Sequence, residues 1–352
     1  MLLDTQRHFG NRFDHRSEGI AWPDKVRELM KRLQQPPMSR RKALSVLAAC
    51  ATGVSLAGCD LWATFGKSDE LSPGGSRLSI PALRARTFGP GEIRLHDVSV
   101  RRPTYTSYVM TYLSDGLRVT GIASIPVGSG PFPVVLLNHG YALPSRYETG
   151  EGTRVMSDAL ASHGFLTLAS DYRGLGGSDD NTSLNLGIRL EFAIDILSLA
   201  AAVRSLPEAR TRPIGIWGHS LGGELALRAA VVDGNIGPVA VWAPMSPWMD
   251  DLAAYYRLPA GESSMDLRTT LSTGNYLSQI RGPIDIHQGE ADQVVNPAWA
   301  GKIHRALLSE GIRSTLHLYP DQGHLLDSAA GIVVSTTTAF FEETFRSFRA
   351  PR

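Results

Sequence analysis

The chain has 352 residues, of which 43% are hydrophobic, and its 35 Lys and Arg residues nearly balance 34 Asp and Glu residues. The formal net charge of +1 gives no sign of the basic stripe that contacts a nucleic-acid backbone, so we expect no nucleic-acid partner. No internal repeat is visible.

Residues 38–59 form a pattern typical of an export signal. Met38-Ser39-Arg40-Arg41-Lys42 supplies a basic start, Ala43 to Leu56 an apolar core, and Leu56-Ala57-Gly58-Cys59 a small-residue end. The apolar run is too short for a comfortable membrane-spanning helix. The alternative is a buried or membrane-surface helix.

The end of this signal, Leu56-Ala57-Gly58-Cys59, resembles the lipobox of bacterial lipoproteins. The resemblance implies cleavage before Cys59, lipidation of that cysteine, and an exported protein anchored in a membrane on its periplasmic or cell-surface side. Because Cys50 would be removed, no disulfide is expected. The signal peptide is then 38–58, and the polar residues 1–37 are interpreted as an over-long gene start.

Residues 59–92 contain turn-rich stretches and are interpreted as a flexible tether. Beyond them, strands and helices alternate in the βαβ pattern of an α/β domain, a mostly parallel sheet with helices on both faces, over 93–350. In chain order we predict a hairpin of strands 108–113 and 117–123 turning at Asp115-Gly116, strand 133–138, helix 154–163, strand 165–169, helix 186–206, strand 214–217, a helix from 221, strand 239–244, a short strand within 282–289, strand 314–320 and a helix over about 330–348.

A serine framed by glycines follows the strand 214–217. Gly218-His219-Ser220-Leu221-Gly222 fits the G-x-S-x-G pattern, in which the serine sits on a sharp turn between a strand and a helix. Small neighbours leave room for the two elements to meet. The pattern indicates that the Ser220 hydroxyl is a nucleophile; the alternative is a glycine-rich turn without chemistry.

A serine nucleophile of this kind needs a histidine base and a carboxylate, in the chain order serine, acid, histidine. Asp292 lies in a polar turn after one predicted strand, and His324 lies in the loop after the next. We therefore predict a triad of Ser220, Asp292 and His324. Glu290 and Asp321 are also in turns and remain rivals for the acid.

Two backbone N–H groups are expected to stabilise the oxyanion that forms during acyl transfer. One belongs to Leu221, directly after the nucleophile, and the other to Tyr141, in the loop after the strand 133–138. The alternative for His139-Gly140 is an ordinary turn at the end of a strand.

The remaining polar residues near the predicted strand ends are interpreted as structural. His219, Asp285, His287 and His317 fall in this group. Because no H-E-x-x-H or paired-cysteine spacing accompanies them, no metal site is expected. The loop 171–178 is rich in glycine but lacks the G-x-G-x-x-G spacing, so no cofactor is expected either.

The chain resembles the α/β-hydrolases, most closely the catalytic domain of the prolyl oligopeptidase family and its small esterase relatives. The segments that carry the resemblance are Ser114-Asp115-Gly116-Leu117, 133–140, Asp171-Tyr172-Arg173-Gly174, 218–223, 289–295 and Gly323-His324. The resemblance implies an α/β-hydrolase fold. The large peptidases of the family also carry a β-propeller, and nothing before residue 93 could form one.

These patterns together predict a serine hydrolase that cleaves a small-molecule ester or a peptide substrate through an acyl-enzyme. A short cap is expected at about 246–279, where Trp248, Met249, Tyr255 and Tyr256 either line an acyl pocket or pack within the cap. The alternatives are a prolyl-oligopeptidase-like peptidase and a lipid-anchored binding protein that has lost turnover.

Overall fold

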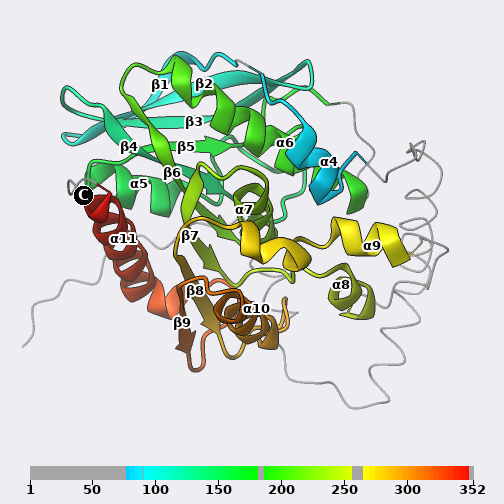
Figure 1. Ribbon diagram of the computed structural model, residues 1–352. Coiled ribbons are helices and arrows are strands. Elements are labelled where there is room, and N and C mark those ends of the chain that lie inside the picture. Colours follow the sequence, from blue (N-terminus) through cyan, green and yellow to red (C-terminus); the bar gives the residue numbers. More distant parts are fainter. Residues whose placement is uncertain (1–76, 90, 181–185, 256–264, 349–352) are drawn as a thin grey trace, which may run out of the picture. The chain divides into compact units, whose positions relative to one another are not determined.

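The computed structural model describes residues 77–89, 91–180, 186–255 and 265–348, which belong to one compact unit of the chain (Figure 1). The predicted gene start, the signal 38–58, the lipidation site Cys59 and the tether up to residue 76 lie outside the described residues. No helix in the described ranges combines the length and apolar character needed to cross a bilayer.

A nine-stranded sheet in the order β1-β2-β3-β5-β4-β6-β7-β8-β9 forms the middle layer. The pairs from β1 to β5 are antiparallel, and those from β5 through β4 to β9 are parallel. The strands are β1 (Arg94–Arg101), β2 (Tyr105–Ser114), β3 (Leu117–Pro126), β4 (Phe132–Asn138), β5 (Leu166–Ser170), β6 (Ala209–His219), β7 (Ile236–Trp242), β8 (Ile284–Gly289) and β9 (Ser314–Tyr319). The predicted mostly parallel sheet is therefore confirmed.

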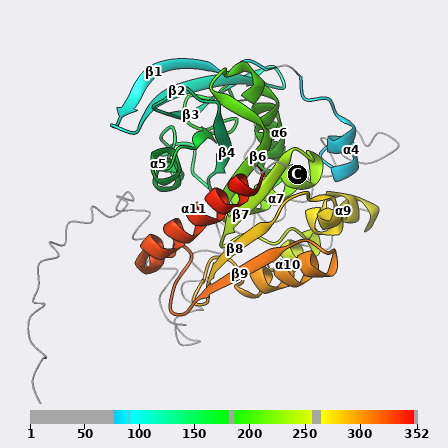
Figure 2. The same cartoon turned by 60° about the vertical axis from the view of Figure 1, so that its left-hand side comes forward.

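Helices cover both faces of this sheet (Figure 2). One face carries α4 (Ile80–Ala85), α6 (Leu186–Ala202), α7 (Leu221–Val232) and α10 (Ala298–Ser309), and the other carries α5 (Arg154–Ser162) and α11 (Ala330–Ser347). Short helical turns complete the chain at η1 (Val203–Ser205), α8 (Met249–Tyr255), α9 (Met265–Leu271), η2 (Thr273–Gln279) and η3 (Asp327–Ala329).

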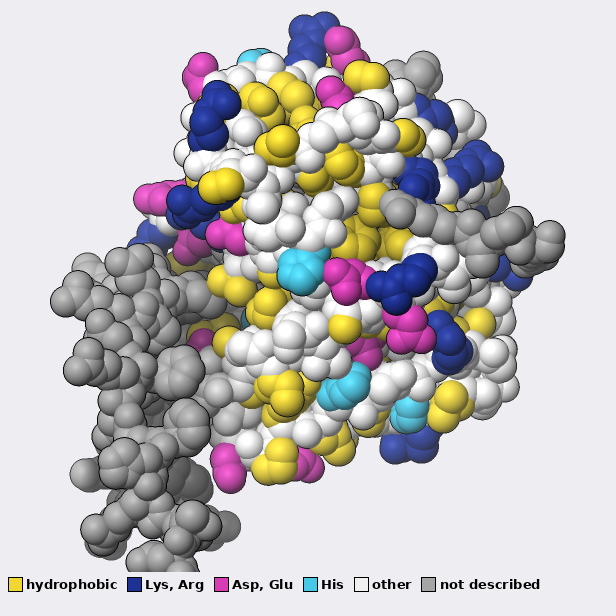
Figure 3. All heavy atoms as spheres, turned by 90° about the vertical axis from the view of Figure 1, so that its left-hand side faces the viewer, with side chains coloured by type: hydrophobic (Ala, Val, Ile, Leu, Met, Phe, Trp, Pro, Cys, Tyr) yellow, Lys and Arg dark blue, Asp and Glu magenta, His cyan; other side chains and the backbone are white. Residues whose placement is uncertain are grey.

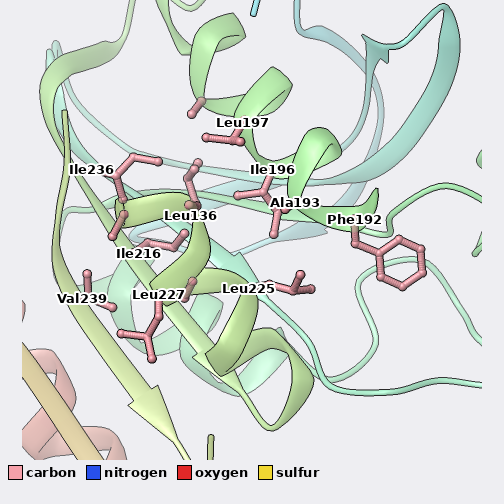
Figure 4. Close-up of a cluster of buried hydrophobic side chains, with 14 of the residues drawn as sticks. Leu136, Phe192, Ala193, Ile196, Leu197, Ile216, Leu225, Leu227, Ile236 and Val239 are labelled. Carbon is pink, nitrogen blue, oxygen red and sulfur yellow. The ribbon is translucent and has the colours of Figure 1, made fainter. Parts of the chain in front are cut away.

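Each face has its own hydrophobic cluster. On one, Ile196 of α6 and Leu225 of α7 pack with Ile216 of β6, and all three are fully buried (Figure 4). On the other, Phe341 and Phe345 of α11 pack against other buried side chains. Burying one such side chain contributes about 1.5–3 kcal/mol, so the sheet is held from both sides.

The start of the domain differs from the prediction. Ser79 caps α4 by accepting a hydrogen bond from the Ala82 N–H, and both Ile80 and Leu83 are fully buried in the cluster shared with α7. The tether expected over 59–92 therefore does not extend through residues 78–86. Two buried apolar side chains and a cap turn this short stretch into part of the fold.

Arg228 of α7 joins this amino-terminal segment to the region of the predicted cap. Its guanidinium is fully buried, pairs with Glu224 at 3.0 Å, and donates to the carbonyl oxygens of Leu271 at 2.7 Å and Leu78 at 3.4 Å. Thr273 donates to the same Glu224 carboxylate. One buried ion pair thus connects α7 to both segments that pack on it.

Acidic and basic side chains are interspersed on the face of the molecule seen from the α11 side (Figure 3). Hydrophobic side chains lie between them in small groups. This face therefore presents mixed charge, as expected from the overall balance.

Candidate active site

Ser220 occupies a strained turn between β6 and α7. Its φ and ψ angles are 58° and −119°, a conformation that non-glycine residues rarely adopt and that is concentrated at functional sites. The Ser220 N–H donates to the Trp242 carbonyl, and the Ser220 carbonyl accepts from Gly223 and Met245. These bonds fix the strained backbone at the carboxyl end of the sheet, where such folds place their sites.

The glycines that frame Ser220 are required by close backbone contacts. A Cβ atom on Gly218 would come within 2.0 Å of the Gly222 carbonyl oxygen, and one on Gly222 within 2.2 Å of the Asn138 carbonyl oxygen. Both distances are far below van der Waals contact. The spacing that singled out Ser220 in the sequence therefore has a steric cause in the structure.

Asp292 and His324 lie together, each in the loop that follows its strand. The Nδ1 atom of His324 is 2.8 Å from Oδ2 of Asp292, and both side chains are buried. The other oxygen, Oδ1, accepts the N–H groups of Val294 at 2.8 Å and Val295 at 3.1 Å. Asp292 is thus held by its own loop while it contacts the histidine.

The rival acids lie elsewhere. Glu290 and Asp321 are exposed to solvent, and neither forms a hydrogen bond with His324 in the structure as described. A carboxylate that orients a histidine must contact its ring. Of the three sequence candidates, the structure brings only Asp292 to His324.

The electrostatics of this pair favour a charged carboxylate. Burial alone would raise the pKa of Asp292, but the hydrogen bond and charge of His324, together with the amides of Val294 and Val295, outweigh it and lower the pKa below its usual value. An ionised Asp292 keeps the Nδ1 proton on His324 and leaves Nε2 free to act as a base.

His219 connects the base to the nucleophile's turn. Its Nε2 atom lies 3.0 Å from the His324 carbonyl oxygen, and the two imidazole rings are 4.7 Å apart. Burial, helped by the nearby His324, lowers the pKa of His219 to about 3. A neutral His219 therefore donates Nε2–H to that carbonyl and holds the His324 loop against Ser220.

No hydrogen bond joins the Ser220 hydroxyl to His324 in the described structure. Catalytic hydrogen bonds in ligand-free enzymes are often long and tighten when substrate binds. The arrangement therefore places base and nucleophile on adjoining loops without linking them.

The loop after β4 lies close to Ser220. A Cβ atom on Gly140 would lie 3.2 Å from the Ser220 Cβ, so the backbone of this loop passes directly beside the nucleophile. The next residue is Tyr141, and Leu221 begins α7. No hydrogen bond from either amide to another protein group is present among the described residues. The assignment of the Tyr141 and Leu221 N–H groups to the oxyanion hole remains a prediction.

A network that the sequence analysis missed supports this loop. His139 stacks between Tyr147 and Tyr172, with ring centroids 4.7 Å and 4.4 Å away. The buried Asp171 carboxylate accepts from the Tyr147 hydroxyl and, at 2.9 Å, from the Gly150 N–H. The segment Asp171-Tyr172-Arg173-Gly174 signalled this network only through family resemblance, because burial of a charged side chain cannot be read from composition.

Arg173, from the same segment, pairs with Asp195 of α6. Its Nη2 atom is 2.7 Å from the Asp195 carboxylate, and its backbone N–H donates to that group at 2.9 Å. Both side chains are almost fully buried. The pair fixes the loop after β5 to α6, beside the site.

The region of the predicted cap contacts the Asp292 loop. Tyr255, at the end of α8, donates its hydroxyl to the Val294 carbonyl at 3.2 Å, and its ring lies 5.0 Å from that of Trp299. Burial and the charge of Asp292 raise the pKa of Tyr255. Tyr256 lies outside the described residues. The stretch of the predicted cap thus contacts the loop that carries Asp292.

Comparison with known proteins gives the family. Residues 122–339, more than half of the chain, match the model of the dienelactone hydrolase family. The chain belongs to the dienelactone hydrolase family. The match spans Ser220, Asp292 and the loop of His324.

Two curated relatives of this dienelactone hydrolase family member share part of its length. The chain is 30% identical over 130 residues to a 31.7 kDa protein in the traX-finO intergenic region of Escherichia coli, covering 35% of this chain and 41% of that protein. It is 25% identical over 191 residues to the 2,6-dihydropseudooxynicotine hydrolase of Paenarthrobacter nicotinovorans, covering 51% and 50%. The chain thus spans half or less of these relatives.

Solved structures share the fold. Acetyl xylan esterase 1 from Thermoanaerobacterium sp. JW/SL YS485 superposes with a TM-score of 0.57 at 23% identity, over 73% of this chain and 93% of that one. The Pyrococcus horikoshii acylaminoacyl peptidase superposes with a TM-score of 0.58 at 18% identity, over 69% and 42%. The predicted α/β-hydrolase fold is confirmed.

Asp285, His287 and His317 form no hydrogen bond with Ser220, Asp292 or His324 in the described structure. They lie on β8 and β9, before the loops that carry Asp292 and His324. Burial lowers the pKa of His287, although its hydrogen bond to Asp285 opposes the shift. These residues form a separate polar cluster.

Proposed function

We propose that the protein hydrolyses a carboxylic ester of a small molecule by acyl transfer through Ser220. The observation that carries the proposal is the buried Asp292–His324 pair, 2.8 Å apart, on loops that adjoin the strained turn of Ser220. No other acid among the sequence candidates contacts this histidine.

In the proposed mechanism, Nε2 of His324 takes the proton of the Ser220 hydroxyl while Oγ attacks the ester carbonyl carbon. The Tyr141 and Leu221 N–H groups donate to the oxyanion, and Asp292 stabilises the imidazolium. His324 then protonates the leaving alcohol. Water, deprotonated by His324, attacks the acyl-enzyme and releases the acid and free Ser220.

An ester substrate is favoured by the likeness of the described domain to an esterase along nearly all of that protein's length. The chain matches 93% of the acetyl xylan esterase but 42% of the acylaminoacyl peptidase. The described domain thus corresponds to the whole of a small esterase and to one part of a larger peptidase. Cleavage of an amide by the same triad is the second candidate, because Ser220 chemistry serves both bonds.

We also propose that the hydrolase acts outside the cytoplasm, on a lipid anchor at Cys59. The basic start, the apolar run and the Leu56-Ala57-Gly58-Cys59 ending support this proposal. Metabolic labelling with radioactive palmitate tests it: the wild-type chain is expected to incorporate label and partition into membranes, and Cys59→Ser is expected to do neither. Label in Cys59→Ser would contradict the assignment.

Activity-based labelling tests the triad. A fluorophosphonate probe is expected to label the wild type and the control Ser335→Ala, which alters an exposed serine on α11, but not Ser220→Ala. Persistent labelling of Ser220→Ala would refute the nucleophile. Assays of short-chain p-nitrophenyl esters beside aminoacyl and dipeptidyl amides identify the bond that is cleaved. Turnover of the amides alone would indicate a peptidase. Absence of both turnover and probe labelling would indicate a binding protein.

A further inference from the structure

Strand geometry gathers one acidic and two imidazole side chains between β8 and β9. Asp285 and His287 are two residues apart on β8 and therefore project from the same face of the sheet. His317 is the register partner of His287 on the neighbouring strand β9. The three side chains lie on the α11 side, where Thr337 of α11 contacts His287 at 3.1 Å.

Both imidazoles direct the same ring nitrogen at one carboxylate. The Nε2 atom of His287 is 2.8 Å from Oδ2 of Asp285, and that of His317 is 2.9 Å from Oδ1. The two rings stack, with centroids 4.6 Å apart and planes 15° apart. One donor atom from each of the three residues lies within 4.8 Å of the others.

The carboxylate at the centre of this cluster has no fixed positive partner. The Asp285 side chain is 3% exposed, and its ion-pair contacts in the described ranges are the two histidines, with no Lys or Arg. A buried carboxylate is costly unless it is paired with a cation or binds a metal. The cluster therefore combines metal-ligand side chains with a buried carboxylate whose ion-pair contacts in the described ranges are imidazoles alone.

We propose that Asp285, His287 and His317 bind a divalent transition-metal ion of the zinc type. Zn²⁺ takes imidazole nitrogen and carboxylate oxygen at about 2.0–2.2 Å in four-coordinate sites. The His317 side chain is 31% exposed, so it can turn to bring its lone pair onto the ion and leaves a fourth position for water. This proposal is independent of the function proposed for Ser220.

Neighbouring groups complete the site. Metal binding requires each neutral imidazole to carry its proton on Nδ1, and at His287 that N–H then donates to the Tyr319 hydroxyl oxygen, 2.7 Å away. Such second contacts fix the tautomer of metal-bound histidines. No proton is released if both rings are neutral beforehand. The ion joins β8 to β9, the strands that lead to Asp292 and His324 respectively.

Metal uptake by the purified full chain tests the site. After treatment with a chelator and titration with Zn²⁺, elemental mass spectrometry is expected to find one zinc per chain, with a higher melting temperature. His317→Gln changes the most exposed ligand and is expected to weaken binding by at least about 100-fold, since loss of even an outer-shell partner costs 10–100-fold. Circular dichroism checks that this variant folds.

Two control variants separate this site from other histidines. His163→Gln alters an exposed histidine directly after α5, and His324→Gln alters the candidate catalytic base; both are expected to bind zinc as the wild type does. The proposal is refuted if the wild type takes up no zinc, if His317→Gln binds it equally, or if His324→Gln abolishes uptake.

Discussion

Replacing Asp292 with asparagine tests whether the carboxylate sets the tautomer of His324. Oδ1 of Asp292 accepts two backbone N–H groups, those of Val294 and Val295, so the asparagine must keep its carbonyl oxygen there. Its NH₂ group then replaces Oδ2 and faces His324 and the Nε2 donor of Gln288, 3.2 Å away. His324 would have to present a lone pair at Nδ1 and carry its proton on Nε2.

A histidine in that tautomer cannot accept the proton of Ser220. The equivalent change in another serine hydrolase lowers kcat by about 10⁴-fold, which corresponds to about 5 kcal/mol of transition-state stabilisation. We expect a similar loss of kcat/KM on p-nitrophenyl esters, while KM changes little. Glu290→Gln and Asp321→Asn, at the exposed rival acids, are matched controls expected to retain activity. A loss of less than tenfold in Asp292→Asn, or an equal loss in either control, would refute the reasoning.

Two further predictions concern stability. Gly222→Ala places a Cβ 2.2 Å from the Asn138 carbonyl oxygen and is expected to destabilise the fold by about 3 kcal/mol or more. Gly331→Ala is the control, because a Cβ at that position meets nothing within 4 Å. Equal urea midpoints for the two variants would contradict the steric account. The pKa of His219 is about 3 in the folded protein, whereas an unfolded histidine takes up a proton near pH 6.5. The contribution of His219 to folding stability is therefore fully present above pH 6.5 and is lost as the pH falls toward 3. The free energy of unfolding changes by at most about 1.4 kcal/mol per pH unit through this group. As the pH is lowered from 6.5 toward 3, the melting temperature of His219→Gln should therefore fall less steeply than that of the wild type. An equal fall in both proteins would show that His219 is not responsible.

The parts of the fold that were predictable carry local signals. Asp115 and Gly116 both adopt positive φ, as the hairpin signal requires, and β2 and β3 pair across them. Gly218 and Gly222 are fixed by contacts within a few residues of Ser220 or with the neighbouring strand. Chain order then pointed to Asp292 and His324, which the structure places together.

Features that depend on distant partners were not predictable. The edge strand β1 is exposed along nearly all its length, so it has no buried apolar face to mark it in the sequence. The pairing of His287 with His317 depends on the register of β8 and β9, which no short segment specifies. For that reason each of these histidines was predicted to be a packing or surface residue of the sheet, and no metal was expected.

The docking of α4 affects how shortened versions of this protein should be interpreted. A chain begun at residue 93, the boundary indicated by the sequence, would lack the fully buried Ile80 and Leu83 and the Leu78 carbonyl that accepts from Arg228. These groups pack on α7, the helix that begins directly after the candidate nucleophile Ser220. If such a fragment were inactive, the loss of packing around α7 would be a sufficient cause. The result would not show which residues perform the chemistry.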